Sequence, residues 1–285
     1  MPDFPIIDSH VHLCDPGKFR YGWMKEKPAL ERLVLPEHLS TAAAGVQVER
    51  YVFAEVVVDS PQHLEEARWV ARLAEQDKRL AGIIAALPLE RGLSIEAEME
   101  ALSCVKGVRS IRRLIENEKD PEFCVKTDFI SALKLLPKYD LAFDVCVFHH
   151  QLPAVIQMVR QCPEVRFVLD HIGKPGIRAE LVEPWRRHIS ELSELPNIWC
   201  KISGVVTEAD HQNWTLDQVR PYIAHAIDAF GFDRVMYGSD WHVLELACTY
   251  PRWVEIVDAM TRDATPVEKR KLFRDNAIEF YRLDG

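Results

Sequence analysis

The chain has 285 residues, 48% of them hydrophobic and 28% charged, which is typical of a soluble globular protein with a substantial core. Its formal net charge of -9 argues against non-specific binding to nucleic acid or to an anionic membrane surface. No apolar run approaches the roughly 20 residues that span a bilayer, and no signal peptide is recognisable. Seven cysteines without a C-x-x-C spacing predict reduced thiols and a cytoplasmic protein.

Strand-like apolar runs alternate with helix-like segments along the whole chain. The pattern predicts strands at about 5–10, 51–58, 80–87, 105–110, 141–148, 166–170, 198–203 and 234–237. It predicts helices at about 36–45, 61–75, 94–104, 128–138, 153–162, 180–194, 215–230, 250–262 and 266–282.

The predicted strands are near-continuous apolar runs, as expected for strands buried on both faces of a parallel sheet. Eight of them alternating with helices predict an α/β fold, a (β/α)8 TIM barrel. No linker divides the chain, so residues 1–285 are expected to form a single domain. The alternative is an open doubly wound sheet, which more typically has a glycine-rich phosphate loop after the first strand. A long connection at about 11–35, containing Tyr21 and Trp23, predicts a lid.

The first predicted strand ends in Asp8-Ser9-His10-Val11-His12. Side chains alternate along a strand, so Asp8, His10 and His12 share one side, which in a barrel is the interior. Barrel active sites lie at the carboxyl ends of the strands, where other polar residues should meet this pair of histidines. The later strand ends supply Glu55, Asp59, Arg109, Asp144, His149, His150, Asp170, His171, Lys201, Ser203, Asp240 and His242. Several imidazoles beside a carboxylate permit metal ligation or proton transfer.

Four motifs stand in barrel order, each at a predicted strand end: Asp-Ser-His-Val-His, Leu-Asp-His-Ile-Gly-Lys-Pro, Lys-Ile-Ser-Gly and Gly-Ser-Asp-Trp. Together they resemble the amidohydrolase superfamily, and within it the branch that hydrolyses sugar lactones and 2-pyrone-4,6-dicarboxylate. The resemblance covers residues 6 to about 280 and implies a distorted (β/α)8 barrel that hydrolyses a lactone ester, above all a sugar-derived aldonolactone. It also implies catalytic positions for His10, His12, His171 and Asp240, with Asp240 activating water and His171 polarising the carbonyl or orienting the water.

The resemblance leaves the metal requirement open. His10, His12, His171 and Asp240 suit a single divalent ion, zinc first, but they also suit a metal-free hydrogen-bonding site such as relatives that hydrolyse pyrone lactones are understood to use. A binuclear centre is not expected, because many family members have a bridging lysine or glutamate on strand four, where Arg109 is the nearest counterpart. A further departure is His242, since the family often has proline there.

Candidate substrate-binding residues are mostly cations near the strand ends: Arg109, Arg112, His150, Lys201 and the lid residue Trp23. An arginine fork suits a carboxylate or a cluster of hydroxyls. Arg113 is an alternative to Arg109 and Arg112 as the strand-four arginine that binds the substrate. We also expect either His149 or His150 to point into the barrel. Glu55 is expected to pair with an interior cation such as Lys201 or to support a metal.

The expected partner is a small-molecule lactone bearing hydroxyl groups, with a pyrone dicarboxylate as second choice. A competing hypothesis is a metal-dependent decarboxylase, a carbon–carbon lyase of the same superfamily. Those relatives usually have proline where this chain has Asp15, which disfavours the lyase. A catalytically silent scaffold would have lost one of the four motif residues, and all four are present.

Overall fold

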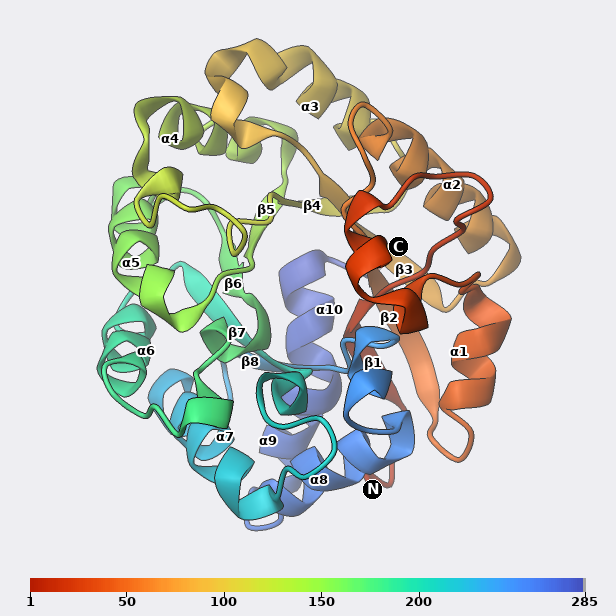
Figure 1. Cartoon of the computed structure of the whole chain (residues 1–285), viewed down its shortest axis with the longest axis vertical. Helices are drawn as coiled ribbons and strands as arrows, with labels where there is room; N and C mark the ends of the chain where they lie inside the picture. Colours follow the sequence, from red (N-terminus) through yellow and green to blue (C-terminus); the bar gives the residue numbers. More distant parts are fainter. Residues whose placement is uncertain (284–285) are drawn as a thin grey trace.

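Eight parallel strands form one sheet in the order β1 to β8 in a computed structural model of the chain, which describes residues 1–283 (Figure 1). The sheet closes on itself, since the Asp240 amide donates to the His10 carbonyl at 2.9 Å and the His12 amide donates to the Trp241 carbonyl at 2.6 Å. The predicted (β/α)8 barrel is therefore confirmed. The strands are β1 Ile6–Val11, β2 Val48–Ala54, β3 Leu80–Ala86, β4 Val108–Arg112, β5 Ala142–Val145, β6 Phe167–Leu169, β7 Ile198–Ser203 and β8 Val235–Gly238.

Helices surround the strands on the outside of the barrel (Figure 1). Among residues 1–283, none of them is long and apolar enough to cross a membrane. All seven cysteines are free thiols. The helices are α1 Pro36–Ala42, α2 His63–Gln76, α3 Glu96–Ser103, α4 Thr127–Leu133, α5 Leu152–Gln161, α6 Trp185–Ser193, α7 Leu216–Phe230, α8 Tyr250–Met260, α9 Pro266–Arg270 and α10 Asn276–Tyr281.

The barrel interior is an apolar core below the strand ends. Inward-facing side chains such as Val52, Ile84 and Met236 are buried together with Phe280 and Tyr281 of α10. Helix α10 lies behind the strands in Figure 1 and packs against the end of the barrel where the strands begin. A buried polar network crosses this core, since Tyr281 donates to Asp144 and Asp144 pairs with Lys201. It leads from α10 towards the opposite, carboxyl ends of the strands, where active sites of this fold lie.

Two predicted strand boundaries are wrong in a way that matters for the site. β2 ends at Ala54 rather than at 58, because Val57 has a φ of 54° and the chain leaves the extended conformation despite its β-branched residues. β4 runs to Arg112, two residues beyond the predicted end. Glu55 and Arg112 therefore lie at the carboxyl ends of their strands, whereas Arg109 lies near the start of β4.

Candidate active site

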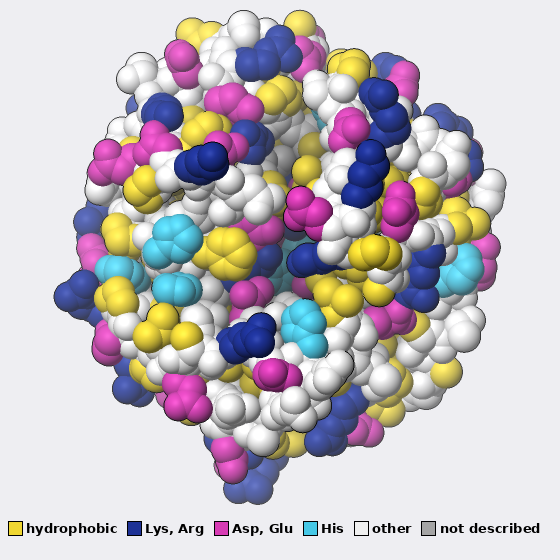
Figure 2. Space-filling model, in the orientation of Figure 1, with side chains coloured by type: hydrophobic (Ala, Val, Ile, Leu, Met, Phe, Trp, Pro, Cys, Tyr) yellow, Lys and Arg dark blue, Asp and Glu magenta, His cyan; other side chains and the backbone are white. Residues whose placement is uncertain are grey.

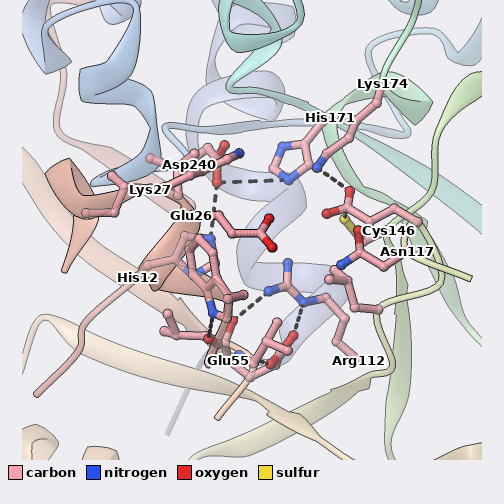
Figure 3. A pocket seen from close by; sticks show the side chains of 17 residues that line it. His12, Glu26, Lys27, Glu55, Arg112, Asn117, Cys146, His171, Lys174 and Asp240 are labelled. Atoms are coloured by element: carbon pink, nitrogen blue, oxygen red, sulfur yellow. Dashed lines mark hydrogen bonds and ion pairs between the residues drawn. The ribbon is translucent and has the colours of Figure 1, made fainter. Parts of the chain in front are cut away.

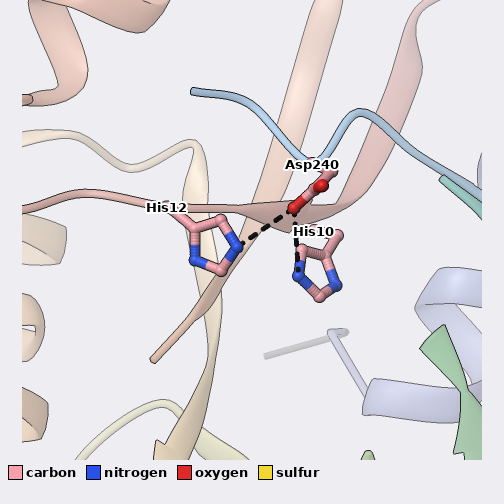
Figure 4. A group of neighbouring side chains, drawn as sticks. All are labelled: His10, His12 and Asp240. Atoms are coloured by element: carbon pink, nitrogen blue, oxygen red, sulfur yellow. Dashed lines mark hydrogen bonds and ion pairs between the residues drawn. The ribbon is translucent and has the colours of Figure 1, made fainter. Parts of the chain in front are cut away.

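Asp240 directs its carboxylate at three imidazoles that come from two other strand ends. Its Oδ1 lies 3.1 Å from Nε2 of His12, 3.7 Å from Nε2 of His10 and 3.9 Å from Nε2 of His171. Figure 4 shows His10 of β1 and His12, which directly follows β1, converging on this carboxylate. The structure thus brings together the four residues that the sequence motifs singled out.

The backbone around Asp240 is built for this approach. Asp240 has a φ of 62°, a left-handed conformation that aspartate tolerates better than most residues. Gly204, which follows β7, passes directly beneath it, and a Cβ atom at Gly204 would lie 2.5 Å from Oδ2 of Asp240. The glycine is therefore needed both for its own φ of 57° and for the room that it leaves.

His171 belongs to a left-handed turn over residues 171–174, where φ is 53°, 49°, 71° and 41° in chain order. Such a conformation costs about 1–2 kcal/mol for each residue with a Cβ atom. Specific contacts offset this cost: the indole of Trp185 donates to the Ile172 carbonyl at 2.8 Å, and the Lys174 amide donates to the His171 carbonyl at 3.0 Å. The turn brings His171 and Lys174 to one cavity.

A metal ion can bind at this site only if the ring nitrogens that face it carry lone pairs, and the hydrogen bonds of His12 and His171 show which nitrogens do. Nδ1 of His12 lies 2.9 Å from the Ala54 carbonyl, and a carbonyl only accepts, so Nδ1 donates and Nε2 keeps a lone pair. Nδ1 of His171 lies 2.8 Å from Oγ and 3.2 Å from the carbonyl of Ser203, which leaves its Nε2 in the same state. Two lone pairs and a carboxylate oxygen thus face one another, an arrangement that requires a proton or a cation. These donors suit a divalent metal such as zinc.

The pKa of Asp240 lies below its ordinary value. Burial by itself would raise it, but the neighbouring imidazoles, His171 first, outweigh burial. The pKa of His171 is lowered by burial, although Asp240 opposes the shift. At neutral pH the site therefore holds an ionised carboxylate beside a neutral imidazole, as both metal ligation and base catalysis require.

Lys201 lies beneath the site and does not line the cavity, so the expectation that it binds substrate is wrong. Its ammonium is fully buried, 2.5 Å from Oδ2 of Asp144, 2.9 Å from Oδ1 of Asp170 and 3.1 Å from Nδ1 of His10. Burial lowers the pKa of Lys201, but the two carboxylates outweigh it and raise the pKa. Lys201 therefore supports His10 from below.

Arg112, which was expected to bind substrate, lines the cavity, but its charge is already neutralised. Its Nε donates to Oε1 of Glu55 at 2.6 Å, and its Nη1 lies 3.4 Å from Oδ2 of Asp170. Its Nη2 donates to the Glu55 carbonyl at 2.6 Å. Glu55 therefore pairs with an interior cation, as expected, but this cation is Arg112 and not Lys201, because the shorter β2 places Glu55 beside the end of β4.

The other expected cations lie outside the cavity. Nε of Arg109 donates to the Arg282 carbonyl at 3.3 Å, at the opposite end of the barrel from Asp240. His150 is exposed and stacks on Phe148, with ring centroids 6.2 Å apart. Nε of Arg113 pairs with Glu90 at 2.9 Å. The expectations for Arg109 and His150 are wrong because both depended on strand ends that the structure places elsewhere.

A cavity of about 210 Å3 opens above Asp240, and Figure 2 shows the hollow on the face that carries the strand ends. Its lining differs with the strand that supplies it. The apolar lining residues come mainly from the loops after β1, β2 and β8, which also supply charged groups: the apolar ones are Trp23, Leu30, Val56, Val57 and Val243. Loops after β4, β5 and β6 contribute Leu114, polar groups and a thiol; Figure 3 labels Asn117, Cys146 and Lys174 among them, and Glu116 lies there too.

The structure adds residues that sequence reasoning missed. Lys174 stands within the Leu-Asp-His-Ile-Gly-Lys-Pro motif, three residues after His171, and that spacing could have pointed to it. Glu116 lies in an irregular connection after β4 and carries no sequence signal. Glu26 and Lys27 of the 11–35 loop also line the cavity beside Trp23. That this loop moves as a lid stays a prediction.

Comparisons with known proteins agree with this geometry. The profile of a family described as Amidohydrolase matches residues 7–283. An L-fucono-1,5-lactonase of Burkholderia ambifaria is 30% identical over 283 residues, covering 98% of this chain and 96% of its own length. A 4-sulfomuconolactone hydrolase of Rhizobium radiobacter is 24% identical over 243 residues, 82% of this chain and 74% of its own length. A crystal structure of an amidohydrolase from Burkholderia multivorans with bound zinc superimposes with a TM-score of 0.88 at 28% identity, covering 98% of this chain and 99% of that one.

Proposed function

The chain belongs to the amidohydrolase family and is a hydrolase, and we propose that it opens the ester ring of a neutral, polyhydroxylated sugar lactone. The observation that carries the proposal is the position of Asp240, an ionised carboxylate ringed by three imidazoles at the floor of a small cavity. A carboxylate in that position is placed to take a proton from a water molecule that attacks an acyl carbon.

Asp240 would act as the general base. An aspartate is a weak base by its ordinary pKa of about 4, and its pKa here is lower still. A lactone is an activated acyl group, however, and a base held in place gains much of its effect from positioning. Because Nε2 of His12 and of His171 keeps a lone pair, these rings, with His10, would stabilise the negative charge on the carbonyl oxygen by holding a cation there rather than by donating hydrogen bonds to it.

We further propose that His10, His12, His171 and Asp240 hold one divalent ion, zinc first. A bound zinc ion supplies Lewis-acid polarisation of a carbonyl and a water molecule of lowered pKa. The chain's own contribution is to orient the ligands. The Ala54 carbonyl fixes the tautomer of His12, and Ser203 fixes that of His171. Lys201 and Asp170 hold His10 in place. Such outer contacts commonly determine how well a ligand set binds.

Charge pairing supports a neutral substrate. The cavity is lined by three cations, Lys27, Arg112 and Lys174, and by four carboxylates, Glu26, Glu55, Glu116 and Asp240. Glu55 and Asp170 neutralise Arg112, and Glu116 neutralises Lys174. Lys27, the third cation, is exposed. A dicarboxylate, or the carboxylate substrate of a decarboxylase, that bound to Arg112 or Lys174 would have to displace their partners at the cost of leaving buried charges unpaired. A pyrone dicarboxylate and a decarboxylation reaction are therefore disfavoured.

Proton release in weakly buffered solution tests the proposal, because opening a lactone yields a carboxylic acid. A panel of aldonolactones should release one proton for each molecule consumed, without carbon dioxide. Carbon dioxide release from an aromatic or unsaturated acid, with every lactone left intact, would instead establish the lyase.

The same assay tests the metal. Protein purified without added metal is analysed for its elemental content, then assayed before and after exhaustive chelation and after zinc is restored. We expect activity to fall on chelation and to return with zinc. Full activity with no metal detected would exclude the ion and leave the lactonase proposal intact.

A further inference from the structure

One ion pair at the cavity wall has no part in the reaction proposed above. Lys174, at the end of the left-handed turn that carries His171, pairs through Nζ with Oε2 of Glu116, which follows β4. Both side chains line the cavity, with exposed fractions of 17% and 14%. Figure 3 shows Lys174 beside His171, on the side of the cavity where Cys146 and Asn117 lie.

The pair leaves hydrogen-bonding capacity free. A lysine ammonium has three N–H donors, and Lys174 directs one of them to Glu116. Oε2 of Glu116 also accepts from Sγ of Cys146 at 3.5 Å. Within residues 1–283 no protein group donates to Oε1 of Glu116. The wall therefore presents donors and an acceptor side by side.

We propose that Lys174 and Glu116 bind two neighbouring hydroxyl groups of the lactone, the ammonium donating to one and the carboxylate accepting from the other. This inference rests on the proposed function and names the feature that the site selects, a vicinal diol. A carboxylate in the same place would be repelled by Glu116, and a plain aliphatic ring would leave the remaining N–H donors of Lys174 and Oε1 of Glu116 without hydrogen-bond partners.

Position and environment favour this role. Lys174 is only three residues from His171, and its amide donates to the His171 carbonyl at 3.0 Å, so the diol site and the imidazole are held in one rigid turn. Burial alone would lower the pKa of Lys174 and raise that of Glu116, but the neighbouring groups reverse both shifts. Both groups therefore stay charged near neutral pH. The opposite wall, with Trp23 and Val56, can cover the less polar face of the ring.

The test compares a vicinal-diol lactone with its two monodeoxy analogues in four proteins: the wild type, Lys174→Met, Glu116→Gln and the double variant. The double variant avoids leaving one buried charge unpaired, so a folding defect of the single variants does not end the test. Lys138→Met is the matched control, because it removes a lysine paired with Glu96 on the surface.

A site that binds a substrate hydroxyl rejects the analogue lacking it by large factors. We expect wild type and Lys138→Met to prefer the diol lactone by at least about a hundredfold in kcat/KM. The double variant should lose at least about tenfold of that preference while still opening the deoxy lactones. An unchanged preference in the double variant would overturn the inference.

Dissociation constants for the corresponding lactams separate this inference from the proposed function. A lactam keeps the ring and the diol but has a less reactive acyl group. If no lactone is turned over, the proposed function fails. The lactam constants then still decide the inference: a diol preference that only the wild type and the control retain supports it, and equal preference in all proteins refutes it.

Discussion

Asp240 keeps its place because Gly204 has no side chain. An alanine at Gly204 would bring Cβ to 2.5 Å from Oδ2 and 2.6 Å from Cβ of Asp240, closer than real carbon contacts allow. The base would have to move away from His12 and His171. Misplacing a reacting group by about 1 Å can cost roughly a hundredfold in rate.

We therefore predict that Gly204→Ala lowers kcat/KM by about a hundredfold or more. Gly231→Ala is the control, because Gly231 has a similar φ of 68° but nothing within 4 Å of its Cβ position. Gly204→Ala should lose roughly 1 kcal/mol of stability from its left-handed conformation. Gly231→Ala should lose about 1–3 kcal/mol, because a φ of 68° with a ψ of 163° is essentially restricted to glycine. Equal activity of the two variants, measured by proton release and compared with their Tm values, would show that the close approach to Asp240 does not matter.

The proton-accepting role of Asp240 has its own test in Asp240→Asn. Asparagine tolerates the left-handed backbone and fills the same space, so the fold should persist by circular dichroism. Loss of a general base typically costs 10² to 10⁴-fold, and we expect kcat to fall by at least about a hundredfold. Near-normal turnover by this variant would remove Asp240 from the mechanism.

The short helical segment η9, Val205–Glu208, follows β7 and places a carboxyl group near the polar wall of the cavity. Burial raises the pKa of Glu208; Lys174 opposes the shift, Glu116 and Asp240 add to it, and the resulting pKa is about 7. A carboxyl whose pKa is raised in the folded protein stabilises the fold while it is protonated. That contribution is complete below the ordinary pKa and is lost as pH rises to the folded value.

We predict that Glu208→Gln, which cannot ionise, gains stability over the wild type as pH increases. The difference in Tm, variant minus wild type, should be small near pH 5 and reach its maximum above about pH 7. Glu122→Gln at an exposed position should show no such trend. A difference that stays constant between pH 5 and 8 would mean that Glu208 ionises normally in the fold.

The accuracy of the sequence prediction differed from one strand end to the next. β7 was predicted at its observed bounds, and the β1 motif correctly placed His10 and His12, because strand periodicity alone determines which side chains share a face. The end of β4 was misjudged by two residues, so Arg109 was expected at the cavity together with Arg112, whereas only Arg112 of these two lines it. Local preference cannot determine where a strand stops when a tertiary ion pair, here Glu55 with Arg112, stabilises the end.

At the scale of the whole molecule, the barrel architecture was predictable because eight apolar runs with helices between them leave few alternatives. The convergence of His10, His12, His171 and Asp240 followed from the same architecture, since all carboxyl strand ends meet at one mouth. The partners of the buried charges did not follow, because a sequence does not tell which of several interior acids lies within reach of Lys201. The polar wall with Glu116 was missed for the same reason.

The charge balance of the cavity leads to the central claim, that the substrate is a neutral lactone rich in hydroxyl groups. The measurement that tests it most directly is kcat/KM, by proton release, for a sugar aldonolactone, γ-butyrolactone and a pyrone dicarboxylate under identical conditions. We predict a preference for the aldonolactone of at least about a hundredfold over both competitors. Equal values for butyrolactone and the aldonolactone, or a strong preference for the dicarboxylate, would contradict the claim.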